Sequence, residues 1–330
     1  MESKRVAFLI ARAAVVTLGV LSAAVPAQAQ QYPARPITLV IPLPPGGSND
    51  IMGRVAAEKL SIALGQQVVI ENRAAGGSGT VATRQVARSA PDGYTLLLTY
   101  TSTLATGPNM LRNAGYDPRK DFAPIGAIAS APALVLAHPS VPARNVADLI
   151  ALMNASTEPF QVGNPSTGTV NHLAAELFAL QAKVKVQQIP YRGSGPLNTD
   201  LIGGHVKVGF NPIPVSRAAI ENGLIRAIAA TSLKRSSLLP DVPTVAESGL
   251  PGFDAVLTYG IAAPANTPRP IIERLNKELR AALAMEDVRR RLIQEGAEPL
   301  STTPEEYAAI IDREETKWST LIKSVGIQPE

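Results

Sequence analysis

The 330-residue chain has no cysteine, three histidines and only 4% aromatic residues. Without cysteine there is no disulfide, no thiolate metal site and no thiol nucleophile. The histidines, His138, His172 and His205, stand outside any metal-binding or catalytic spacing, and neither an HExxH nor a GxSxG motif occurs. We therefore expect no metal, no cofactor and no enzyme active site.

The chain also has little excess of positive over negative charge. The formal net charge is +4, and the first 29 residues contribute +2 of it, from Lys4, Arg5 and Arg12 against Glu2. The remaining charge of about +2 (4 − 2) is too small and too scattered for a nucleic-acid surface. The low aromatic content leaves few platforms for stacked bases. We expect no nucleic-acid partner.

Residues 1–29 are typical of an export signal. Lys4 and Arg5 precede an apolar run that only Arg12 interrupts, and a small-x-small sequence ends at Ala29. A retained membrane anchor is the alternative, but Arg12 leaves the uncharged part of the run short for a bilayer. We expect cleavage after Ala29 and a mature protein in the periplasm.

Strand-like apolar runs alternate with helical patterns from residue 36 to about residue 230. The run at 36–43, for example, precedes a helical pattern in which Met52, Val55 and Leu60 share a face. Alternation of this kind predicts an α/β protein with largely parallel sheets, and the length predicts about two domains. From Thr267 onward the pattern is helical only, with Thr303 expected to cap the last helix.

Four loops follow predicted strands and precede predicted helices, which is where ligands bind in open α/β sheets. They are residues 44–50, 76–80, 164–169 and 192–196. In the first loop, "PPGGSND", two glycines permit close approach of the backbone, and Ser48 or Asn49 can cap the helix. Amides at such a helix start favour an anion. A plain turn with a good cap is the alternative.

The role of Asp50 and the chemistry of the 164–169 loop are the next features of these loops. Asp50 would repel a nearby anion, so it either caps the loop locally or binds an amino or amide group of a ligand. The loop "GNPSTGT" offers hydroxyl groups, and Gly168 offers an unobstructed N–H. It is not a P-loop, because Thr169 stands where that motif needs lysine.

Several long motifs resemble one family. "PITLVIPLPPGGSND", "IPYRGSGP", "LPDVPTVAESGLPGF" and "GIAAPANTP" are similar to the Bug/TctC-type extracytoplasmic solute receptors of tripartite tricarboxylate transporters. The resemblance covers essentially the whole chain after the export signal. It implies a two-lobed periplasmic binding protein fold, type II-like, with two hinge-crossing segments near "GAIASAPAL" and "DAVLTYGIA". We expect lobe 1 at 31–130 plus 257–330, and lobe 2 at 131–256.

The resemblance also implies a function and a site. Such receptors hold a small organic acid (a di- or tricarboxylate, an acidic amino acid or an aromatic carboxylate) through backbone amides and hydroxyls, and they pass it to membrane subunits of the transporter. A monomer is expected. The matching positions are Pro45, Gly46, Gly47, Ser48, Asp50, Thr101, Ser102, Ser166, Thr167, Gly168, Thr169, Tyr191, Gly193 and Asn211.

The sequence departs from the family pattern at positions near the cleft, so the identity of the ligand stays open. The family often has an aromatic residue at the position of Leu43, a Gly-Ser pair at Gly163-Asn164 and tryptophan at the position of Tyr259.

Two other functions remain as alternatives to the transport receptor. One is a receptor that feeds a signalling system, and the other is an exported hydrolase using Ser166 or Ser194, for which the sequence shows no nearby base.

Overall fold

The computed structural model describes residues 32–73 and 79–329. The expected export signal and most of the 76–80 loop lie outside these residues. The chain divides after Ala34 into two units, and the second, Arg35–Glu330, contains the helices and strands of the fold. Among the described helices, none combines the length and the apolar character needed to cross a bilayer.

The first half of the sheet is built around three parallel strands. β1 (Ile37–Ile41) lies between β2 (Val68–Asn72) and β3 (Thr95–Tyr100) and runs parallel to both. The connections carry α2 (Ser48–Leu64) and α3 (Thr80–Ala87), and β3 leads into a π-helix (Ser102–Thr106) and α4 (Gly107–Met110). Each strand therefore ends in a loop that opens a helix, as the sequence predicts.

The second half repeats this arrangement. β5 (Phe160–Asn164) runs parallel to β6 (Val186–Pro190) and to β7 (Val208–Pro212), and β8 (Arg226–Ala230) completes this half. The helices are α5 (Val146–Ala155), α6 (Val170–Ala182), α7 (Ser194–Gly203) and α8 (Ile213–Glu221). Most strands again end where a helix begins.

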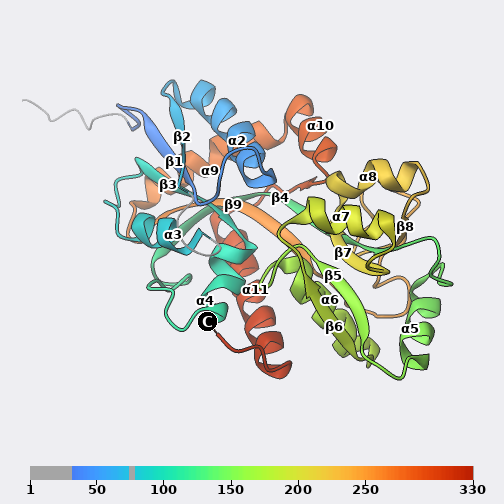
Figure 1. The fold of residues 1–330 in the computed structure, drawn as a ribbon. Coiled ribbons are helices and arrows are strands. Elements are labelled where there is room, and N and C mark those ends of the chain that lie inside the picture. Colours follow the sequence, from blue (N-terminus) through green and yellow to red (C-terminus); the bar gives the residue numbers. More distant parts are fainter. Residues whose placement is uncertain (1–31, 74–78, 330) are drawn as a thin grey trace, which may run out of the picture. The chain divides into compact units, whose positions relative to one another are not determined.

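Two long strands join the halves (Figure 1). β4 (Phe122–Ala137) pairs antiparallel with β9 (Val256–Pro264) through its first part and with β7 and β8 through its last five residues. β9 also pairs with β3, so the strand order is β2-β1-β3-β9-β4-β7-β5-β6. The predicted α/β class with two crossing segments is confirmed. The expectation of largely parallel sheets is wrong, because the crossing strands pair antiparallel with each other and with β3, β7 and β8.

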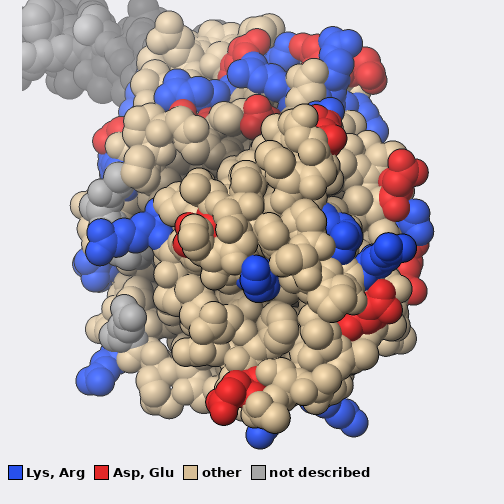
Figure 2. Space-filling model, turned by 45° about the vertical axis from the view of Figure 1, so that its right-hand side comes forward, with Lys and Arg blue, Asp and Glu red and all other residues tan. Residues whose placement is uncertain are grey.

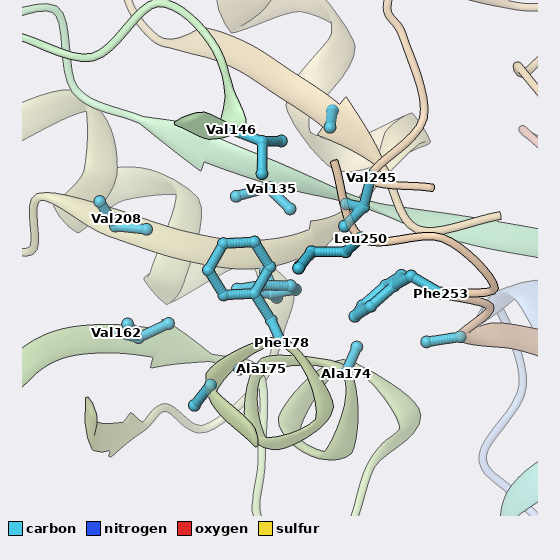
Figure 3. Close-up of a cluster of buried hydrophobic side chains, with 14 of the residues drawn as sticks. Val135, Val146, Val162, Ala174, Ala175, Phe178, Val208, Val245, Leu250 and Phe253 are labelled. Atoms are coloured by element: carbon cyan, nitrogen blue, oxygen red, sulfur yellow. The ribbon is translucent and has the colours of Figure 1, made fainter. Parts of the chain in front are cut away.

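Each half has its own apolar core. In the second half, Phe178 of α6 packs edge-on against Phe210 and Phe253, with ring centroids 5.9 and 6.4 Å apart. Figure 3 shows Phe178 beside Leu250 and Phe253, with valines of the strands around them. In the first half, a cluster containing Val40 and Leu97 lies between the sheet and helices. These cores hold the strand ends, and hence the loops, in place.

The C-terminal stretch returns to the first half and also reaches the second. It forms α9 (Arg269–Leu283), α10 (Glu286–Gln294), the short β10 (Glu298–Pro299) paired with β4, and α11 (Pro304–Ser324). The expectation of helix alone is thus wrong at β10, while Thr303 caps α11 as predicted. Tyr307 of α11 packs in the first core and Trp318 in the second, so α11 contacts both.

Candidate functional site

The loop after β1 presents the first turn of α2. Gly46 has φ +88°, which only glycine adopts easily, so the predicted need for glycine is met there. The predicted caps are wrong: Gly47 is the N-cap, without a side-chain hydrogen bond, and Ser48 and Asn49 are the first two helical residues. Their amides therefore belong to the first turn, where an α-helix offers no internal acceptor.

Asp50 binds groups of its own loop and helix. Its Oδ2 accepts hydrogen bonds from the Gly46 amide (3.0 Å) and from Arg54 Nε (2.8 Å), and its Oδ1 accepts one from Asn72 Nδ2 (3.0 Å). The Arg54 hydrogen bond, above all, lowers the pKa of this buried carboxyl to about 2, although burial acts in the opposite direction. Of the two roles left open by the sequence, these contacts match local capping.

The Asp50 contacts predict a pH-dependent loss of stability. Because the folded pKa of about 2 lies below the ordinary 3.8, the stabilisation is complete above about pH 4 and disappears as the pH falls through 2. We expect Asp50→Asn to lower the free energy of unfolding by about 2 kcal/mol at neutral pH. Urea unfolding from pH 7 to pH 2 should show this difference shrinking in acid. The exposed Asp241→Asn control should show little change at any pH, and a constant Asp50→Asn deficit down to pH 2 would refute the assignment.

Thr101 and Ser102 follow β3 and are buried. Thr101 Oγ1 accepts a hydrogen bond from the Thr258 amide of β9 at 2.8 Å. Ser102 begins the π-helix. Thr101 thus ties the end of β3 to a crossing strand, and it lines a small cavity of about 10 Å³ beside α11.

The 164–169 loop is held from both halves. The Gly168 amide donates to His172 Nδ1 at 3.2 Å, so the expected unobstructed N–H is occupied. The Gly168 carbonyl accepts from Thr106 Oγ1 of the first half at 3.1 Å. Thr169 is the N-cap of α6 and accepts from the His172 amide, while Ser166 and Thr167 are exposed. The loop therefore fixes the start of α6.

His172 takes part in this local network. Burial lowers its pKa to about 4, and its Nδ1 accepts the Gly168 N–H, which requires the neutral ring. These contacts of His172 are therefore local hydrogen bonds. No group of three or more potential metal ligands occurs in the parts of the chain that the structure describes.

Tyr191, Gly193 and Asn211 brace the neighbouring loop. The Tyr191 hydroxyl donates to Asp200 (2.9 Å), and the Gly193 amide donates to the Pro165 carbonyl (2.8 Å). Asn211 Nδ2 donates to the Ser194 carbonyl and to Ser216 Oγ, both at 3.2 Å. Asn211 Oδ1 is buried and has no partner among the described residues. These contacts link the 164–169 and 192–196 loops.

A cavity of about 150 Å³ lies where the two halves of the sheet meet. Its walls come from the starts of α2, α6 and α8, from both crossing strands and from the end of α10: Ser48, Asn49, Ala131, Pro132, Ala133, Val170, Asn171, Pro212, Pro214, Leu257, Tyr259 and Glu295. The first two residues of α2 and the first two of α6 are all present. Residues of two helix starts, whose amides have no acceptor within the helix, therefore line one cavity.

Ser48 is the one residue of the predicted site that lines this cavity. Most of the others lie in the loops before the helix starts, while Asp50 is in the first turn of α2, Asn211 is in β7, and Thr101 and Ser102 follow β3. Sequence reasoning missed Asn49, Val170, Asn171 and Glu295. Asn49 lies inside the predicted 44–50 loop, and Val170 and Asn171 are the first two residues after the predicted 164–169 loop, so helix numbering could have found them. No pattern in the sequence marks Glu295.

The cavity offers both hydrogen-bond donors and acceptors. Helix N-termini carry partial positive charge, and Tyr259 adds a phenol whose pKa burial raises far above its usual value, so it stays protonated. The acceptors are the Glu295 carboxylate and the buried Asn49 Oδ1, which has no partner within the described chain. No Lys or Arg is among the lining residues. Elsewhere, the face in Figure 2 carries scattered charges of both signs.

The sequence of the chain is similar to those of known proteins. Residues 52–327 match the tripartite tricarboxylate transporter family receptor, TctC. The chain belongs to the TctC family. It is 36% identical over 313 residues to the protein BugT of Bordetella pertussis, covering 94% of this chain and 95% of BugT.

Solved structures of TctC-type proteins share the fold. The periplasmic binding protein BugD is 35% identical, with a TM-score of 0.74 over 91% of this chain and 100% of BugD. Rpa4515 of R. palustris, solved with adipate, is also 35% identical, with a TM-score of 0.78 and the same coverage. The predicted two-lobed periplasmic binding protein fold is thereby confirmed, and these neighbours are solute-binding proteins.

Proposed function

We propose that this TctC family member captures a small organic carboxylate between its two lobes and delivers it to the membrane subunits of a tripartite tricarboxylate-type transporter. One observation carries the proposal. Ser48 and Asn49 of α2, and Val170 and Asn171 of α6, bring the first amides of two helices, one from each half, to a single cavity. An anion at this point meets two positive helix ends.

The free energy of hydrogen bonds to backbone amides is sufficient to bind a carboxylate without a cationic side chain. A hydrogen bond to a charged group contributes about 1.5–3 kcal/mol. Four such amides give roughly 6–12 kcal/mol before desolvation and ordering costs. Micromolar binding requires about 8 kcal/mol. Backbone amides, helix ends and the Tyr259 hydroxyl can therefore hold a carboxylate, and catalysis has no part in the proposal.

The lobe assignment follows the sequence prediction. Lobe 1 comprises residues 31–130 and 257–330, lobe 2 comprises 131–256, and β4 and β9 cross between them. The packing of α11 on both cores adds a third connection. Binding selects a closed arrangement that a membrane partner recognises. We place the protein in the periplasm as a monomer without cofactor, after cleavage behind Ala29.

A thermal-shift screen of the purified chain tests this function. Residues 30–330 should melt at a temperature several degrees higher with one carboxylate of a panel that includes adipate, malate and aromatic acids. Ligand at 100 times its dissociation constant stabilises by about 2.7 kcal/mol. The methyl ester of the same acid is the matched control and should give no shift. Equal stabilisation by the acid and its fully esterified form would contradict carboxylate recognition.

A further inference from the structure

Glu295 gives the cavity a group of the wrong polarity for a second carboxylate. Glu295 is the only charged residue among those that line it. No hydrogen bond or ion pair to the Glu295 carboxylate occurs within residues 32–73 and 79–329. A carboxylate that lines a cavity without such a partner repels an anion there and attracts a cation.

The backbone around Glu295 also disfavours an anion and favours a cation. Glu295 is the C-cap of α10, where the helix carries partial negative charge. The α2 and α6 residues that line the cavity are at helix N-termini. Glu295 therefore adds a carboxylate and a negative helix end to a cavity whose other helix ends, the starts of α2, α6 and α8, are positive. Asn49 Oδ1, buried and unpartnered in the described structure, adds an acceptor.

Glu295 is held at the cavity by packing. The next residue, Gly296, has φ +68°, and a Cβ there would lie 3.0 Å from Pro214 Cδ of α8. The amides of Gly296 and Ala297 donate to the carbonyls of Ile293 and Leu292, which closes the end of α10. The turn that carries Glu295 thus packs directly on the start of α8, across the cavity's edge.

We propose that the cavity selects a compact carboxylate that also carries an ammonium group, with the ammonium at Glu295 and the carboxylate at the starts of α2 and α6. This inference rests on the proposed function and narrows its substrate class. Dicarboxylates of the same length place a second anion against Glu295. They bind more weakly for that reason.

Matched ligand pairs test this. Calorimetric titration of the chain compares β-alanine with succinate, 4-aminobutanoate with glutarate, and 5-aminopentanoate with adipate, so that only the terminal group changes. In the best-fitting pair the amino acid should bind at least 10-fold more tightly. Glu295→Gln should weaken that amino acid at least 10-fold and leave the dicarboxylate unchanged or tighter. Glu286→Gln, an exposed carboxylate on the same helix, is the control and should keep the wild-type preference.

The outcomes separate the two proposals. If dicarboxylates bind as tightly as their amino partners, or if Glu295→Gln keeps the wild-type preference, this inference is overturned while carboxylate capture stands. If no carboxylate in the pairs or in the thermal-shift panel binds, the proposed function fails and this inference fails with it.

Discussion

Ser48→Pro should weaken binding of the best carboxylate from the screen about 10- to 150-fold, which corresponds to one hydrogen bond of 1.5–3 kcal/mol to a charged group. Proline removes the amide at the first position of α2, where the ring is compatible with a helix. Gly47, which precedes it, has ψ 172°, an extended conformation that a following proline tolerates. The fold should therefore persist, and calorimetric titration measures the effect.

Ser48→Ala is the matched control because it removes the hydroxyl and keeps the amide. We expect it to weaken binding less than the proline variant. The melting temperature of both variants without ligand should stay within a few degrees of the wild type. Wild-type affinity in Ser48→Pro would mean that the α2 start does not bind the ligand, and the proposed function would lose its central contact.

Trp318→Ala should cause the largest loss of stability, about 3–5 kcal/mol, because a fully buried aromatic side chain leaves a cavity. Trp318 packs in the core of the second half although α11 begins in the first. Its Nε1 donates to Glu314 Oε2 at 2.8 Å, and Lys317 Nζ lies 4.4 Å from the ring centroid. The loss is large against a typical total of about 5–15 kcal/mol.

Urea unfolding of the variant provides the measurement, with two controls. Trp318→Phe keeps most of the ring and should cost less than the alanine variant. Leu180→Ala removes a half-exposed apolar side chain from α6 and should change stability by under about 1 kcal/mol. A Trp318→Ala loss as small as that of Leu180→Ala would show that α11 does not brace the second half.

The sequence by itself determined the local elements. Strand runs, the glycines of the first loop and the capping residue Thr303 all act through neighbours within a few positions, so their effect can be predicted along the chain. The family followed from long motifs of the same kind. For this reason the loops that end at α2 and α6 can be located from the amino-acid sequence alone.

Only the tertiary structure decided which groups face the cavity. The Gly46 and Gly168 amides are occupied by Asp50 and His172, so the available amides lie two to three residues further on, within the helices. Glu295 reaches the cavity because Gly296 packs on Pro214, about 80 residues away in sequence. Hydrogen-bond partners and contacts across such separations depend on how the lobes and helices pack, and no local pattern encodes that.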